Sequence, residues 1–97
     1  MPTSDRLVIL ADGKIGIEGN SNPKSALSFA STTGNKIDFY YDSPTAMYGI
    51  GIAGAELQLY TNTNTAHTSV GYGSSTSFTE TFRINNVGNT VITNPIL

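Results

Sequence analysis

The side chains that could perform acid–base chemistry are few and scattered. The chain carries seven carboxylates and one histidine, His67. Glycoside hydrolysis needs two carboxyl groups about 5–10 Å apart, one with a raised pKa, and Asp38 and Asp42 lie too few residues apart on one strand and its turn to support that arrangement. We expect structural or solvent-facing roles for all the carboxylates, which are Asp5, Asp12, Glu18, Asp38, Asp42, Glu56 and Glu80.

Motifs for nucleophilic, phosphate and metal chemistry do not occur in the sequence. It contains no Gly-x-Ser-x-Gly, no phosphate-binding glycine loop and no Asp-x-Asp calcium loop. Without cysteines, a single histidine cannot form a typical structural zinc site. His67 is therefore expected to be exposed; the alternative is that a trimer gathers three copies around a metal ion or an anion. The sequence predicts no enzyme, no cofactor and no metal site, and it assigns no ligand-binding residues.

The composition fits one small domain that spans residues 1–97. Charged residues make up 12% of the chain and the net charge is −2, and the five basic residues form no cluster that could bind nucleic acid. No run approaches the ~20 apolar residues of a membrane span, and the first residues lack the features of a signal peptide. A domain of this size buries only roughly 60–65% of its unfolded surface, so oligomerisation is one way to supply the missing core.

Apolar residues recur with a period of two almost everywhere, as in β-strands. Asp12-Gly13 is typical of a tight turn, and Thr33-Gly34-Asn35 is expected to join the next pair of strands. Short loops favour an antiparallel meander, because parallel strands need long crossovers. We expect an all-β sandwich or a trimeric β-prism-like fold with about nine short strands, covering residues 7–10, 14–18, 27–30, 37–41, 48–52, 56–60, 70–73, 78–84 and 90–93.

Alternation also predicts which residues share a face. Phe78, Glu80, Phe82 and Ile84 have one parity, and Glu80 is expected to pair with Arg83 or with a neighbouring chain. The tyrosines suit sugar or protein contacts, or packing between sheets or subunits. Tyr40 and Tyr60, which lie opposite the apolar residues of their strands, are the better candidates for exposure; the others are Tyr41, Tyr48 and Tyr72.

Several glycines lie inside strands, opposite the apolar residues. Glycine in a strand costs roughly 0.5–1 kcal/mol relative to alanine, so its repeated use has a cause. The positions could be bulges or bends, places where another chain packs closely, or a platform for a flat sugar ring. The glycines concerned are Gly16, Gly49, Gly51, Gly71 and Gly73.

Residues 69–89, SVGYGSSTSFTETFRINNVGN, carry a resemblance to a known family. They resemble the repeats of phage tail fibres and related surface fibres that precede an endosialidase-type intramolecular chaperone domain. The shared pattern "T-E-x-x-R-I" followed by "x-x-G-N-V" appears here as residues 79–84 and 87–89. The chain departs from the pattern after Asn89 and ends at Leu97, which leaves an excised domain, a product of self-cleavage or a small stand-alone protein open. Further similar stretches are 34–40, 48–52 and 57–62, so the resemblance covers roughly residues 25–94.

The resemblance implies a homotrimeric β-rich fibre segment. The expected function is a non-enzymatic structural or receptor-binding module of a phage or phage-like tail fibre, located in the virion or outside the cell. Its partners would be two further copies of itself and a glycan or protein of the host surface, where weak contacts add through avidity. The alternatives are a monomeric carbohydrate-binding β-sandwich of a secreted protein, a spacer that binds nothing and, more distantly, a small hydrolase.

Overall fold

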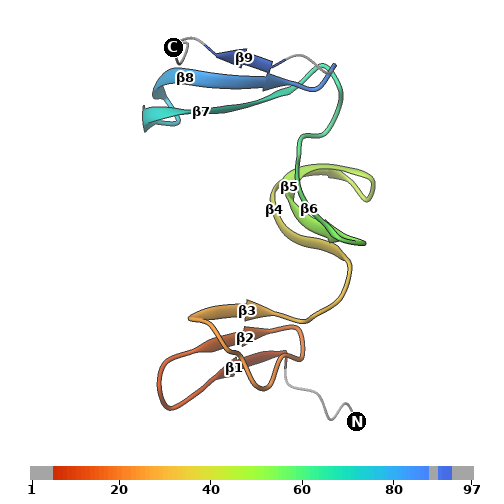
Figure 1. Cartoon of the computed structure of the whole chain (residues 1–97), viewed down its shortest axis with the longest axis vertical. Helices are drawn as coiled ribbons and strands as arrows, with labels where there is room; N and C mark the ends of the chain where they lie inside the picture. Colours follow the sequence, from red (N-terminus) through yellow and green to blue (C-terminus); the bar gives the residue numbers. More distant parts are fainter. Residues whose placement is uncertain (1–5, 88–89, 93–97) are drawn as a thin grey trace.

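The described part of the chain forms nine strands in three separate sheets (Figure 1). This computed structural model describes residues 6–87 and 90–92, which contain no helix. The prediction of an all-β fold with about nine strands is confirmed. Sheet A contains β1 (Leu7–Ile9), β2 (Ile15–Ile17) and β3 (Leu27–Phe29). Sheet B contains β4 (Gly34–Ser43), β5 (Ala46–Ala53) and β6 (Glu56–Tyr60), and sheet C contains β7 (His67–Ser74), β8 (Ser77–Asn85) and β9 (Thr90–Ile92).

The sheets follow one another along the long axis of an elongated molecule that measures 51 × 30 × 29 Å. In sheets A and C the strands run across this axis (Figure 1). The extensive contacts between described strands all join strands of the same sheet, so the described residues form no sandwich. Two linkers, residues 30–33 and 61–66, connect the sheets. The first is tied to sheet B by Lys36, whose Nζ donates to Ala30 O and Thr32 Oγ1, both at 2.9 Å.

Among the described strands, five of the six pairs are antiparallel, as the meander predicts, but β2 and β3 are parallel. Residues 18–26 form the connection, and positive φ angles at Glu18 (58°) and Gly19 (86°) turn the chain back. Asn20 Nδ2 then donates to Phe29 O at 3.0 Å, which fastens the connection across the sheet. Parallel strands usually need a long crossover connection, so the sequence did not predict that residues 18–26 join two parallel strands.

The predicted hairpin between residues 27–30 and 37–41 is wrong. Gly34 and Asn35, taken as its turn, begin β4 and pair with β5. The chain leaves β3 through an extended linker instead, and β3 pairs only with β2 among the described strands. Other expected short turns did form: residues 11–13 lie between β1 and β2, residues 44–45 between β4 and β5, residues 54–55 between β5 and β6, and residues 75–76 between β7 and β8.

Bulges change the faces that simple alternation predicts. β8 has one extra residue, Thr81, because Val70 pairs with Phe82 while Gly71 pairs with Glu80. An extra residue reverses the alternation of faces that follows it. Glu80 therefore lies on the face of Arg83, whereas Phe82 lies on the opposite face, and the predicted common face of Phe78, Glu80, Phe82 and Ile84 is wrong. β4 has three such shifts, with extra residues at 36, 39 and 42, and it curves strongly (Figure 1).

The mid-strand glycines are places where the chain's own backbone comes close. A Cβ on Gly71 would collide with the Thr79 carbonyl and lie 2.9 Å from the Phe78 ring. A Cβ on Gly51 would lie 2.9 Å from Gly34 O and 3.0 Å from the Tyr60 ring. A Cβ on any of the other three glycines would likewise collide with a nearby backbone carbonyl; these are Gly16, Gly49 and Gly73. The described close contacts of these glycines are therefore with the chain's own backbone, and register shifts lie beside Gly51 and Gly71. The interpretations that involve another chain or a sugar ring stay predictions.

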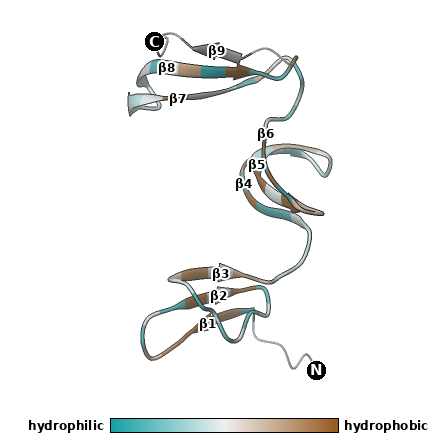
Figure 2. Ribbon diagram, viewed as in Figure 1, coloured by the Kyte–Doolittle hydropathy of each residue, from teal (hydrophilic) through white to brown (hydrophobic). Residues whose placement is uncertain are grey.

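Each sheet has an apolar face that no described residue covers. Register pairs place Leu7 opposite Ile17 and Ile9 opposite Ile15 in sheet A, and Ile50 opposite Leu59 in sheet B. Met47, 6% exposed, is the only buried large apolar side chain among the described residues. Figure 2 shows hydrophobic segments, coloured brown, within strands of all three sheets. The apolar face of sheet A comprises Leu7, Ile9, Ile15, Ile17, Leu27 and Phe29; that of sheet B, Ile37, Tyr40, Tyr48, Ile50, Ile52, Leu57 and Leu59; that of sheet C, Val70, Tyr72, Phe82 and Ile84.

Candidate functional site

Most of the described carboxylates lie on the surface, singly or with one polar partner. Glu18, Asp38 and Glu56 are exposed, and Asp5 lies outside the described residues. Asp12 forms an ion pair with Lys14 at 2.5 Å, and the hydrogen bond from Lys14 lowers the pKa of Asp12. In residues 6–87 and 90–92, no group of three or more metal-ligating side chains is placed to hold a metal ion.

Glu80 is the carboxylate with the most developed environment. Ser69 Oγ donates to its Oε2 at 2.5 Å, and Arg83 Nε lies 3.0 Å from both carboxylate oxygens. The predicted pairing with Arg83 is confirmed. The hydrogen bond from Ser69, followed by that from Arg83, lowers the pKa of Glu80. A general acid needs a raised pKa instead, so this cluster favours the ionised form of Glu80, which joins β7 to β8 through Ser69 and Arg83.

His67 and the tyrosines occupy distinct places. His67 is exposed at the start of β7, as expected. Tyr40 is 63% exposed, which confirms its predicted exposure, but the bulges of β4 put it on the apolar face. Its ring meets that of Tyr48 edge to face, with centroids 5.8 Å apart. Tyr60 is half-buried on the opposite face of sheet B, so its expected exposure is wrong: the ring lies over Gly51, which has no side chain to displace it.

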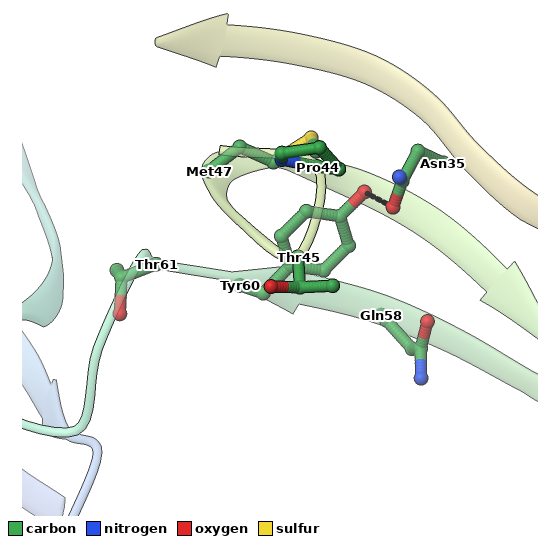
Figure 3. A pocket seen from close by; sticks show the side chains of 7 residues that line it. All are labelled: Asn35, Pro44, Thr45, Met47, Gln58, Tyr60 and Thr61. Atoms are coloured by element: carbon green, nitrogen blue, oxygen red, sulfur yellow. Dashed lines mark hydrogen bonds between the residues drawn. The ribbon is translucent and has the colours of Figure 1, made fainter. Parts of the chain in front are cut away.

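The best-defined hollow lies on this glycine-bearing face of sheet B. It has a volume of about 220 Å³ and is centred on Tyr60 (Figure 3). Register pairs put Tyr60 beside Gly49 and Gln58 beside Gly51, so β6 supplies one wall. The bend of β4 brings Asn35 to the other side, where its Oδ1 accepts a hydrogen bond of 2.9 Å from the Tyr60 hydroxyl. The pocket is lined by Asn35, Pro44, Thr45, Met47, Gln58, Tyr60 and Thr61.

The lining groups of this pocket are uncharged. Two amides, two threonine hydroxyls and a phenol provide both donors and acceptors, while Met47 and Pro44 provide apolar surface. Only Tyr60 was singled out by the sequence, as a tyrosine suited to sugar or protein contacts. The other lining residues were missed, because they meet only when β4 bends over β5. The one indication in the sequence was Gly51, because a glycine within a strand often marks a place where another group packs close to the backbone.

A second, shallower hollow of about 510 Å³ lies beside Tyr40 and Tyr48. Its polar edge is formed by Asp42 and Asn62, and Asn62 Nδ2 donates to Asp42 Oδ2. Because the two tyrosines belong to the apolar face of sheet B, this hollow is open only as long as that face stays uncovered.

The surroundings of these sites give no further identification. The described residues include no helix that is long and apolar enough to cross a membrane. Comparison of the chain with known protein families, with curated proteins and with solved structures found no match.

Proposed function

We propose that this chain is a non-enzymatic structural and receptor-binding segment of a phage or phage-like tail fibre, and that it works as a homotrimer. The proposal is supported by the resemblance of residues 69–89 to fibre repeats and by one physical observation. That observation is the large apolar surface that the chain alone leaves in water.

The total accessible surface of the chain, polar and apolar together, can be compared with that of a compact protein of the same mass. A compact monomer of 10.3 kDa exposes about 5,400 Å², whereas this chain exposes 7378 Å², an excess of about 2,000 Å². Its radius of gyration is 17.1 Å, against about 12.5 Å for a compact domain of this length. Obligate interfaces bury 2,000–5,000 Å² in total, or about 1,000–2,500 Å² from each partner. The excess thus has the size that association with further copies would remove.

The position of the exposed residues favours a partner with the same pattern. The large exposed side chains include Ile9 (66%) in sheet A, Leu59 (66%) in sheet B and Val70 (59%) in sheet C. They lie on all three sheets along a 51 Å molecule, so a partner must match the chain over its whole length. Two further copies around a common long axis meet this requirement, since each sheet then faces its own equivalents. The number three comes from the fibre resemblance.

The role of such an assembly is mechanical and multivalent. In the trimer, hydrogen bonds within each sheet and apolar contacts between copies would hold the three sheets in line. Three copies also present each outward-facing group three times, so that weak contacts to a host surface combine through avidity. The open edges of β1, β3, β4, β6, β7 and β9 would lie next to other copies, where they are protected from unspecific pairing.

The molecular mass in solution tests the proposal directly. Light scattering after size-exclusion chromatography is expected to give about 31 kDa, three times the chain mass of 10.3 kDa. A monomer at micromolar concentration would contradict the fibre assembly, and a dimer would contradict its three-fold form.

The receptor-binding part needs a separate measurement. The labelled trimer is expected to bind host cells or a host glycan array, with weaker binding when the chains are monomeric. A stable trimer that binds neither cells nor glycans would be a spacer, and the receptor-binding role would then be wrong.

A further inference from the structure

We infer that the pocket around Tyr60 on the glycine-bearing face of sheet B binds one ring of a neutral, hydroxyl-rich ligand, that is, a single sugar residue. The inference extends the proposed function and rests on it for its biological setting, because the ligand would be part of a host-surface glycan.

The hydrogen-bonding groups of the pocket point to hydroxyls. The Tyr60 hydroxyl donates its hydrogen bond to Asn35 Oδ1, so it can only accept a hydrogen bond from a ligand. Gln58 Nε2 donates to Glu56 Oε1 at 2.6 Å, which leaves Gln58 Oε1 as an acceptor. Asn35 contributes its remaining amide hydrogens, and Thr45 contributes a hydroxyl. An anion would need donors alone and a cation acceptors alone, whereas a sugar hydroxyl uses both kinds.

The charge and shape of the pocket agree with that class of ligand. No charged residue lines it, and an ionic group placed there would lose hydration without gaining a counter-ion. Met47 and Pro44 offer apolar surface to the C–H groups of a pyranose ring, beside the aromatic ring of Tyr60 (Figure 3). The volume of about 220 Å³ is below the range of about 300–1,000 Å³ of pockets for drug-sized molecules, so it suits one ring.

The place of the pocket is compatible with assembly. Its residues Met47, Gln58 and Tyr60 lie on the face of sheet B opposite Ile50, Leu57 and Leu59. Covering the apolar face by other copies therefore leaves the pocket open. The Tyr40–Tyr48 hollow, in contrast, lies on the apolar face and would be covered.

Nuclear magnetic resonance of methionine methyl groups can test binding with little ambiguity. With ¹³C-methyl labelling, the signal of Met47 reports on the pocket that this residue lines. The probes are methyl glucoside, methyl galactoside and N-acetylglucosamine, with glucuronate and glucosamine as charged rings of similar size. We expect the Met47 signal to move with at least one neutral probe, with a Kd of about millimolar as for a ligand of this size, and to respond at least severalfold more weakly to both charged probes.

A matched pair of variants links the shift to the pocket. Thr45→Val removes a pocket hydroxyl at nearly constant shape and is expected to weaken binding about 3- to 10-fold. Thr76→Val makes the same change in the β7–β8 turn and is expected to leave binding unchanged. Equal effects of the two variants would contradict the inference, as would equal or stronger binding of the charged probes.

Measuring the mass of the same sample separates the two proposals. A trimer whose Met47 signal stays still with every neutral probe overturns the sugar pocket and leaves the fibre assembly intact. A monomer whose Met47 signal moves overturns the assembly and leaves the pocket intact.

Discussion

Replacing Leu59 by alanine distinguishes an assembled chain from an isolated one. Leu59 is 66% exposed in the single chain. An exposed side chain of a monomer can be shortened with a change in stability within about 0.5 kcal/mol. In the proposed trimer, Leu59 lies on the covered face of sheet B, and its removal takes apolar contact from each of the three copies.

The expected effect follows from the exposed fraction. Burying a whole leucine side chain stabilises by about 1.5–3 kcal/mol, so burying the two-thirds that are exposed is worth about 1–2 kcal/mol per copy. Three copies give about 3–6 kcal/mol, which raises the dissociation constant of the trimer by about 10²- to 10⁴-fold. Because dissociation into three chains depends on the square of concentration, the protein concentration at half-dissociation rises about 10- to 100-fold.

Sedimentation velocity over a dilution series measures this concentration. Val87→Ala is the matched control, since Val87 is 64% exposed but lies in the β8–β9 turn, outside the apolar faces. It is expected to leave the dilution curve in place. If Leu59→Ala and Val87→Ala shift the curve equally, the apolar face of sheet B is not an interface and the reasoning fails.

Three further predictions concern the chain itself. Gly71→Ala places a Cβ against the backbone carbonyl across the bulge and is expected to destabilise by about 1–3 kcal/mol in chemical denaturation, while Gly54→Ala, with open space around it, stays within about 0.5 kcal/mol; equal costs would refute the steric account. Because the pKa of Glu80 is lowered on folding, its contribution to stability is fully present above its unfolded pKa and is lost as pH falls through the folded one; Ser69→Ala should raise this pKa in a carboxyl NMR titration, and an unchanged titration would show that the hydrogen bond is not the cause. Lys36→Met removes both bonds to the first linker and is expected to speed amide exchange at residues 30–33, whereas exchange at the wild-type rate would mean that the lysine does not hold the linker.

Local sequence rules predicted the elements that depend only on neighbours along the chain. The period of two located the nine strands, and Asp12-Gly13 formed the expected turn, because both signals act within a few residues. The faces of β4 and β8 were not predictable in the same way. A bulge such as the one at Thr81 depends on the register with the partner strand, which the single strand does not encode.

The candidate pocket could not be predicted from the sequence for a related reason. Asn35 and Tyr60 are 25 residues apart and belong to the two outer strands of sheet B. They meet because β4 bends over β5 and because Gly51 leaves room for the Tyr60 ring. The mid-strand glycine gave a signal of close approach, but only the pairing of three strands identifies what approaches.

The extensive contacts between strands lie within single sheets, so the length of the molecule is roughly the sum of the lengths of its three sheets. Each unit of three strands occupies roughly a third of the 51 Å axis, or about 17 Å. Removal or duplication of one whole unit, cut in the linkers at residues 30–33 and 61–66, would therefore shorten or extend the rod stepwise while the other units keep the backbone pairing within their sheets. Recombination of whole units would thus change the length of the rod without a change inside any sheet.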